Sequence, residues 1–370
     1  MSFMTPDRRK MLAGSGALAL VAGGAATWNE VRRMGSMDDY NAFASAQRSV
    51  LAQQPEMLDL IRYATLAANG HNTQSWRFRL SQSVIELLPD FSRRTPVVDP
   101  DDHHLYSSLG CAAENLALAA EARGRRAEIK FAPADHGSVV VMLASGSSKA
   151  SELFDAIPKR QSTRAEFDGR PIAAADLNTL RAAAAVEGVD VAFIVDRPQM
   201  GRVRDLVIAG NSAQMGDPAF LRELKHWLRF SPRQAMRAGD GLFAASSGNP
   251  ILPSWLGSTL FDWVFRADAE NDKYAHQLRS SAGVAVFVAA RDDPEHWVLA
   301  GRACQRFALQ ATALGLKISF VNQPAEVTAL RPELATLVGL PGRRPDIVMR
   351  FGYGPTLPYS PRRPVKAVIA

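Results

Sequence analysis

Two stretches of this chain resemble each other, and an internal repeat restricts the available folds more than any other feature of the sequence. Residues 110–124 and 301–315 both run from glycine to glycine, and their apolar positions fall in step at helical spacing, with Leu116 matching Phe307. A closing glycine suits the left-handed cap of a helix. Each stretch therefore predicts a buried helix that ends at its second glycine.

Two predicted strands follow each of these helices. They cover Ala127–Phe131 and Ser138–Leu143 after the first helix, and Lys317–Val321 and Asp346–Phe351 after the second. Alanine-rich helices can resemble one another by chance, but the shared order of helix, glycine and two strands favours two related halves. We expect an α+β protein with halves at 45–150 and 151–370, each a small, mainly antiparallel sheet packed with helices.

The composition limits the classes of partner. With 47% hydrophobic and 22% charged residues over 370 positions, the chain has the make-up of a globular protein with a sizeable core. Its net charge of +6 is modest, and no nucleic-acid motif is present, so we expect no nucleic-acid partner. Cys111 and Cys304 fit neither a disulfide framework nor a zinc site and are expected in the core on helices; a single disulfide is the alternative.

The N-terminus has the pattern of a targeting signal. Arg8-Arg9-Lys10 precedes a soft apolar run, Ala13–Ala26, as in a twin-arginine export signal over residues 1–27. This predicts recognition by the export machinery and a periplasmic or exported protein, tethered to the membrane if the signal is not cleaved. An amphipathic tail or a weak membrane anchor is the alternative.

A polar loop with amide side chains lies between a helix predicted at about 56–68 and a strand that begins at Trp76. Its candidate binding residues are Asn69, His71, Asn72 and Gln74. Amides both donate and accept hydrogen bonds, which is what recognition of a heterocycle edge requires. An ordinary turn that uses asparagine for its geometry is the other interpretation.

Two basic segments could hold a phosphate. In an extended chain Arg160, Ser162 and Arg164 share one side, and two guanidinium groups with a hydroxyl form a good phosphate cradle. Arg362 and Arg363 stand between two prolines that stiffen the tail. A solvated linker and a solvated tail are the plain alternatives.

A third feature, residues 101–104, contains two aspartates and two histidines, but adjacent histidines seldom converge on one ion. Acidic residues suit the start of a helix there, and we expect no metal site.

A long insertion is expected at about 217–262. It carries aromatic side chains that could cover a ligand, namely Phe220, Trp227, Phe230, Phe243, Trp255 and Phe261.

These motifs together resemble the nitroreductase superfamily. Asn72-x-Gln74-Ser75-Trp76 is similar to the family's Asn-x-Gln-Pro-Trp signature, and Arg160-x-Ser162-x-Arg164 resembles its phosphate motif. The tail at 362–364 resembles its basic C-terminus. In that family the phosphate motif comes first, whereas here the order is reversed. Ser75 and the turn at 68–70 also depart from the family's proline-containing pattern.

A tandem duplication explains the reversed order. The resemblance is to the Acg-type branch, in which two fused repeats form a pseudo-dimer around one FMN, and residues 223–229 and 240–242 resemble that branch's lid over the flavin. The resemblance implies an FMN-dependent oxidoreductase that passes hydride from a small-molecule reductant to a small-molecule acceptor and that is able to act as a monomer. An FMN-sequestering protein with a covered site is the runner-up, and a cofactor-free carrier of apolar ligands is a third reading.

Overall fold

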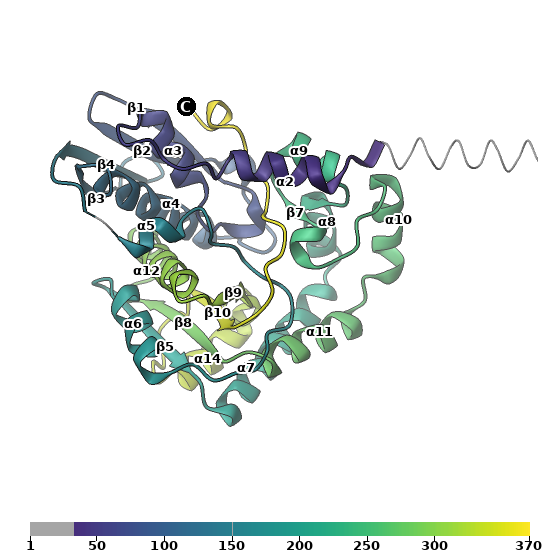
Figure 1. Cartoon of the computed structure of the whole chain (residues 1–370). Coiled ribbons are helices and arrows are strands. Elements are labelled where there is room, and N and C mark those ends of the chain that lie inside the picture. The colour runs from purple at the N-terminus through teal and green to yellow at the C-terminus, as the bar shows by residue number, and fades with distance from the viewer. Residues whose placement is uncertain (1–32, 150) are drawn as a thin grey trace, which may run out of the picture.

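The computed structural model describes residues 33–149 and 151–370, so the export signal predicted at 1–27 lies outside the described residues (Figure 1). The first half consists of helices and a sheet in this order: α2 (Met37–Ala46), α3 (Met57–Thr65), β1 (Trp76–Leu80), β2 (Val84–Pro89), α4 (His103–Glu121), β3 (Arg125–Ala132) and β4 (Ser138–Ser145). In this sheet all neighbouring strands are antiparallel, in the order β1-β2-β4-β3.

The second half repeats this arrangement. Its elements are α5 (Glu152–Ala156), α6 (Ala174–Ala184), β5 (Val189–Ile194), β8 (Gly283–Ala289), α12 (Pro294–Ala313), β9 (Lys317–Phe320), α13 (Gln323–Glu326), α14 (Arg331–Leu337) and β10 (Ile347–Gly352). The antiparallel sheet has the order β5-β8-β10-β9. Strand for strand, this is the order of the first sheet, and α12 takes the place of α4. The expected α+β class with two similar halves is confirmed.

The two sheets differ in what covers them. In β8, alternate residues face opposite sides: Ala285 and Phe287 pack toward α6 and α12, whereas Val284 and Val286 pack toward a second cluster that includes residues of α7. Both faces are buried, so the strand is apolar throughout. The first sheet buries one face against α3 and α4, and its strand β1 alternates between buried and exposed residues.

An insertion separates β5 from β8. Residues 195–282, called the insertion below, replace the tight turn that joins β1 to β2. The insertion forms α7 (Arg197–Met215), α8 (Pro218–Trp227), β6 (Leu228–Arg229), α9 (Pro232–Ala238), β7 (Leu242–Phe243), α10 (Ser254–Val264) and α11 (Ala267–Arg279). It therefore extends beyond the stretch 217–262 that the sequence suggested. In Figure 1 its helices α8, α9 and α10 form a separate layer beside the sheets.

The two halves join along α4 and α12, which make the most extensive contact between two elements. Gly110 lies against the backbone of Val298, and Gly301 lies against the backbone of Ser107. Each glycine thus meets the residue three positions before the other glycine. This reciprocity is what a two-fold axis between duplicated halves produces. The predicted closing glycines of both helices have the left-handed φ that their caps require, +76° and +74°.

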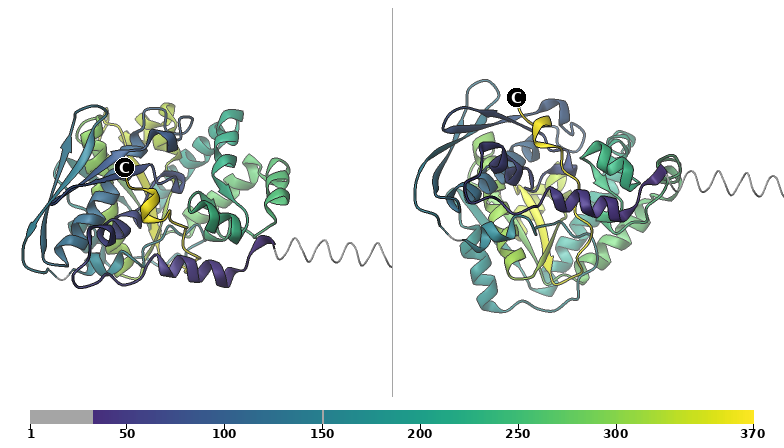
Figure 2. Two further views of the ribbon diagram at one scale, coloured as in Figure 1. Left: turned by 90° about the horizontal axis from the view of Figure 1, so that it is seen from above. Right: turned by 45° about the horizontal axis from the view of Figure 1, so that its top comes forward.

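Each half also extends a terminal segment that packs on the other half. The C-terminal tail returns to the first sheet, where the amide of Phe78 donates to the carbonyl of Val368. At the other end of the chain, α2 packs on α9 of the insertion. Figure 2 shows the yellow tail and the purple α2 crossing between the halves. Among the described residues, no helix is long and apolar enough to cross a membrane.

Candidate functional site

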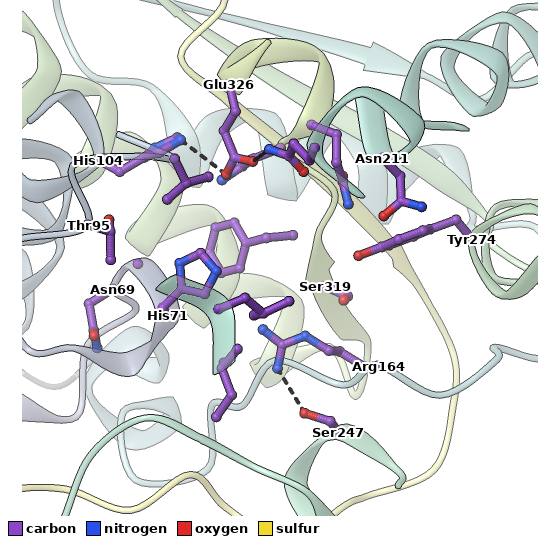
Figure 3. Close-up of a pocket in the computed structure, with 18 of the residues that line it drawn as sticks. Asn69, His71, Thr95, His104, Arg164, Asn211, Ser247, Tyr274, Ser319 and Glu326 are labelled. Atoms are coloured by element: carbon purple, nitrogen blue, oxygen red, sulfur yellow. Dashed lines mark hydrogen bonds and ion pairs between the residues drawn. The ribbon is translucent and has the colours of Figure 1, made fainter. Parts of the chain in front are cut away.

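A cavity of about 220 Å³ lies where the two halves and the insertion meet. The first half contributes the loop after α3 and one face of α4. The second half contributes Arg164, β9 and α13, and the insertion closes the remaining side with α7, α8 and α11. Figure 3 shows the polar side chains that point into it, and they come from both halves. A ligand in this cavity would contact both halves at once.

The loop between α3 and β1 has an unusual backbone. Three of its residues have a positive φ, at 45° for His71, 54° for Asn72 and 54° for Gln74. Side chains other than glycine seldom adopt this conformation, and such strain is typical of functional sites that the surroundings hold in place. Asn69 and His71 line the cavity. The amide of Gln74 donates to the Asn69 side chain at 2.9 Å, which helps to fix the loop.

Asn72 and Gln74 are not among the residues that line the cavity, and their side chains join distant segments. The Asn72 amide donates to Gly241 O and Pro361 O, both at 3.0 Å, while its oxygen accepts from Arg362 at 2.8 Å. Gln74 donates to Gly239 O at 2.8 Å and accepts from the amide of Arg363 at 2.9 Å. These two amides therefore fasten the insertion and the tail to the loop.

The structure separates the three residues of the predicted phosphate cradle. Arg164 lines the cavity, and its guanidinium lies 3.4 Å from the hydroxyl of Ser247 (Figure 3). Ser162 forms a bridge with Ile318 beside β9. Arg160 is buried, donates to Leu66 O at 2.9 Å, and leaves its Nε without a partner. Of these three residues, Arg164 alone forms part of the cavity wall.

Arg160 belongs to a cluster of buried arginines with Arg48 and Arg362. Burial lowers the pKa of all three, to about 10 for Arg48, and repulsion from Arg160 lowers the pKa of Arg48 and Arg362 further. Arg362 donates to the carbonyls of Thr65, Leu66 and Ala67 at the end of α3. Within residues 33–149 and 151–370, none of the three has a carboxylate partner. Uncompensated buried cations favour an anion close by.

A histidine and a carboxylate meet across the cavity from the two halves. His104 on α4 lies 3.5 Å from Glu326 on α13, which accepts from the Gln214 amide at 2.6 Å. Burial opposes both charges, but the contact with Glu326 raises the pKa of His104, and His104 lowers the pKa of Glu326. The two groups thus form an ion pair. His71 is neutral in contrast, because burial lowers its pKa to about 4.

The acidic and histidine residues at 101–104 diverge. His103 pairs with Asp346 at 2.8 Å, and Asp101 pairs with Arg344 at 2.6 Å. Among the described residues, the one group with metal-ligand spacing is Asp293, Glu295 and His296 at the start of α12. As predicted, α4 begins within this stretch, at His103.

Cys111 and Cys304 are buried on α4 and α12, as predicted for core residues, and both thiols are free. Both also line the cavity, and the Cys111 thiol donates to Gly301 O at 3.1 Å. The disulfide that the sequence left open does not form. The cavity floor is therefore made by the same pair of helices that joins the two halves.

An acidic residue fixes the insertion to the first half near the cavity. Asp240 is buried between two arginines and pairs with Arg93 of the first half and, at 2.6 Å, with Arg229 of the insertion. Sequence reasoning did not single out Asp240 for this contact. It missed Arg48, Glu326 and Tyr274 altogether, the last of which lines the cavity from α11. Asp240 lies in the segment 240–242 that resembles a lid, whereas Arg48, Glu326 and Tyr274 lie in no local motif. The pairing of distant segments is what brings these three to the site.

Known proteins and solved structures show some similarity to this chain. No protein-family model matches the chain. Over 323 residues it is 27% identical to a Mycobacterium tuberculosis protein named "Putative NAD(P)H nitroreductase", found in two strains, and the match covers 84% of this chain and 90% of the relative. The chain is a distant relative of these proteins.

Solved structures with some likeness include two nitroreductases. One is a nitroreductase with bound FMN from Desulfitobacterium hafniense, with 16% identity, a TM-score of 0.37, and coverage of 58% of this chain and 94% of that chain. The other is an FMN-dependent nitroreductase from Mycobacterium smegmatis in complex with NADPH, with 14% identity, a TM-score of 0.36, and coverage of 55% and 87%.

Proposed function

We propose that this chain is an FMN-dependent oxidoreductase of the nitroreductase superfamily, in the branch with two fused repeats, and that one flavin binds between its halves. One observation carries the proposal: a cavity shared by both halves lies beside buried arginines that have no carboxylate partner among the described residues. The similarity to the mycobacterial proteins supports the choice of chemistry.

The donor groups of the site fit an FMN phosphate. Arg160 Nε and Arg48 Nε are buried without a partner, and Arg164 has one weak contact, with Ser247, on the cavity side. A phosphate dianion is the kind of ligand that such guanidinium groups recognise. We assign Arg164 and Arg160 to the phosphate, with Arg48 and Arg362 adding positive potential behind them.

The first half would hold the ring. Asn69 offers an amide at the cavity wall, and neutral His71 offers a ring nitrogen without adding charge. Asn72, Gln74 and Arg363 contribute by fixing the loop and the tail that position these groups.

When bound, FMN supplies a two-electron redox centre that no side chain of this protein can provide. The chain contributes binding, orientation and a proton reservoir. The His104–Glu326 ion pair holds a proton on the His104 ring at the cavity wall, and Phe220 and Leu224 of the insertion keep bulk water out. The proposed reaction partners are a small-molecule reductant and an electron-poor acceptor.

The choice of reductant depends on the compartment. The names of the relatives point to NAD(P)H. If residues 1–27 act as an export signal, nicotinamide cofactors are scarce at the destination, and we expect a different physiological reductant. Robust turnover of NAD(P)H in the periplasm would contradict that part of the proposal.

The test of the cofactor is the visible spectrum of the purified chain. Wild-type protein should be yellow and release FMN on denaturation, whereas an Arg160→Ala, Arg164→Ala double variant should lose the colour. A matched control, Arg170→Ala with Arg181→Ala, removes two exposed arginines from the same half and should stay yellow. A wild-type protein that is colourless and does not bind added FMN would overturn the proposal.

A second candidate is an FMN-sequestering protein, because the insertion supplies a whole side of the cavity. Phe220, Leu224 and Phe265 of the insertion line the cavity. If these residues block access, a Phe220→Ala, Phe265→Ala variant should accept electrons from dithionite or NADPH much faster than wild type. Equal rates in both proteins would remove steric blockade as an explanation.

A further inference from the structure

Helix α10 of the insertion exposes an unusual amount of apolar surface. Trp255 is 61% exposed, Leu260 36% and Trp263 79%. The three lie on one side of the helix, and no other described tryptophan is exposed. Large exposed apolar side chains that cluster on one element usually mark a surface of interaction.

The opposite side of α10 is already used for packing. Gly257 lies against the ring of Phe230, and Phe261 is buried and stacks on Phe265, with ring centroids 4.5 Å apart. Phe265 in turn lines the cavity. The two tryptophans are therefore not needed to hold α10 on the insertion, and their exposure requires another explanation.

The described part of the chain begins beside this helix. Helix α2 packs on α9, and a Cβ added at Gly35, just before α2, would lie 3.1 Å from the backbone nitrogen of Arg233 on α9. Helices α9 and α10 are linked through Ser231 and Ser254. The views in Figures 1 and 2 agree that α2 begins next to α10. The described chain thus begins close to the exposed tryptophans, and the apolar run at 13–26 precedes that point in the sequence.

We propose that α10 is a membrane-interface helix, and that Trp255 and Trp263 insert at the headgroup level of a lipid bilayer. Tryptophan suits this level because its ring is apolar and its N–H is polar. A helix that packs on the protein along one side and exposes apolar side chains along the other lies in the plane of the membrane interface and does not span the bilayer. Two exposed basic residues, Arg237 on α9 and Arg266 between α10 and α11, would add an attraction to anionic headgroups.

Tryptophan fluorescence can test this contact in the full-length chain. A Trp28→Phe background removes the tryptophan outside the described residues; Trp76, Trp227 and Trp297 are buried, so quenching reports on α10. The protein is mixed with vesicles of phosphatidylcholine and phosphatidylglycerol that contain brominated lipid, and binding is measured by flotation. The test variant is Trp255→Ser with Trp263→Ser. The control, Val50→Ser with Val195→Ser, removes two apolar residues exposed elsewhere.

The proposal predicts strong quenching in the background protein and in the control. The test variant should bind vesicles about tenfold more weakly. Binding without quenching would show that the N-terminal segment alone touches the membrane, which overturns the proposal. Shielding of both tryptophans from acrylamide before vesicles are added would also overturn it: a monomer in sedimentation then identifies the chain's own N-terminus as the cover, and a dimer identifies a second copy.

Discussion

The crossing of α4 and α12 should not tolerate a methyl group at Gly301. A Cβ there would lie 1.9 Å from Ser107 O, and contacts below 3.0 Å are essentially never seen, so the helices would have to separate by about 1.1 Å. Both sides of the contact are backbone, which cannot rotate away.

The expected cost follows from this geometry. Overpacking of a well-packed core costs about 1–3 kcal/mol, and a backbone clash belongs at the upper end. Alanine recovers about 1 kcal/mol through its helix propensity. Gly301→Ala should therefore lower the free energy of unfolding by about 2 kcal/mol, which corresponds to a fall in Tm of about 3 °C in a protein of this size.

Gly201→Ala is the matched control. Gly201 also lies inside a helix, α7, and a Cβ there meets nothing within 4 Å. This variant should gain about 1 kcal/mol from propensity alone. The assay is thermal unfolding of all three proteins under the same conditions. A Gly301→Ala protein as stable as the control would refute the close crossing.

The reciprocal glycine adds a second check. Gly110→Ala should cost about as much as Gly301→Ala, because its Cβ would lie 2.0 Å from Val298 O. The shift that relieves one clash also relieves the other, so the double variant should cost clearly less than the sum. Additive losses would show that the two contacts do not belong to one pair of helices.

Three further predictions concern single groups. Asp240→Asn leaves two half-buried arginines, Arg93 and Arg229, without their buried counter-charge. It should cost about 3 kcal/mol in urea unfolding and make the insertion sensitive to limited proteolysis, while an intact insertion would contradict the pairing. His71 has its pKa lowered to about 4, so its contribution to stability is complete above pH 6.5 and is lost as the pH falls toward 4. His71→Asn should remove about 2 kcal/mol of the wild-type loss between pH 7.5 and pH 5, and parallel pH profiles would argue against a neutral buried histidine. Cys111 and Cys304 should react with a thiol reagent such as DTNB only after unfolding, since both are buried; rapid labelling of the native protein would show an open cavity floor.

The parts of the fold that local patterns encode could be predicted from the sequence. The two helices with their closing glycines, the strands after them and the core cysteines all follow from patterns within about 50 consecutive residues. Their arrangement could not be predicted. Nothing in the sequence shows that Gly110 and Gly301 touch each other's helix, because that contact depends on how the halves dock.

The site was predicted in part, for the same reason. Asn69, His71 and Arg164 line the cavity, as predicted for binding residues. Alternation in an extended segment does not explain why Arg160 instead donates to Leu66 O at the end of α3. Arg48 could not be found, since it is a single arginine after α2 with no motif around it. The insertion was underestimated because its flanking helices, α7 and α11, carry no aromatic signal as clear as that of residues 217–262.

The central claim is that one chain, with its two halves, binds one FMN. The most direct measurement is the ratio of released FMN to polypeptide, combined with the mass of the particle in sedimentation or native mass spectrometry. The account predicts one FMN for each 40.2 kDa chain, and the same ratio whether the particle is a monomer or larger. Two FMN per chain, one FMN shared between two chains, or none would contradict it.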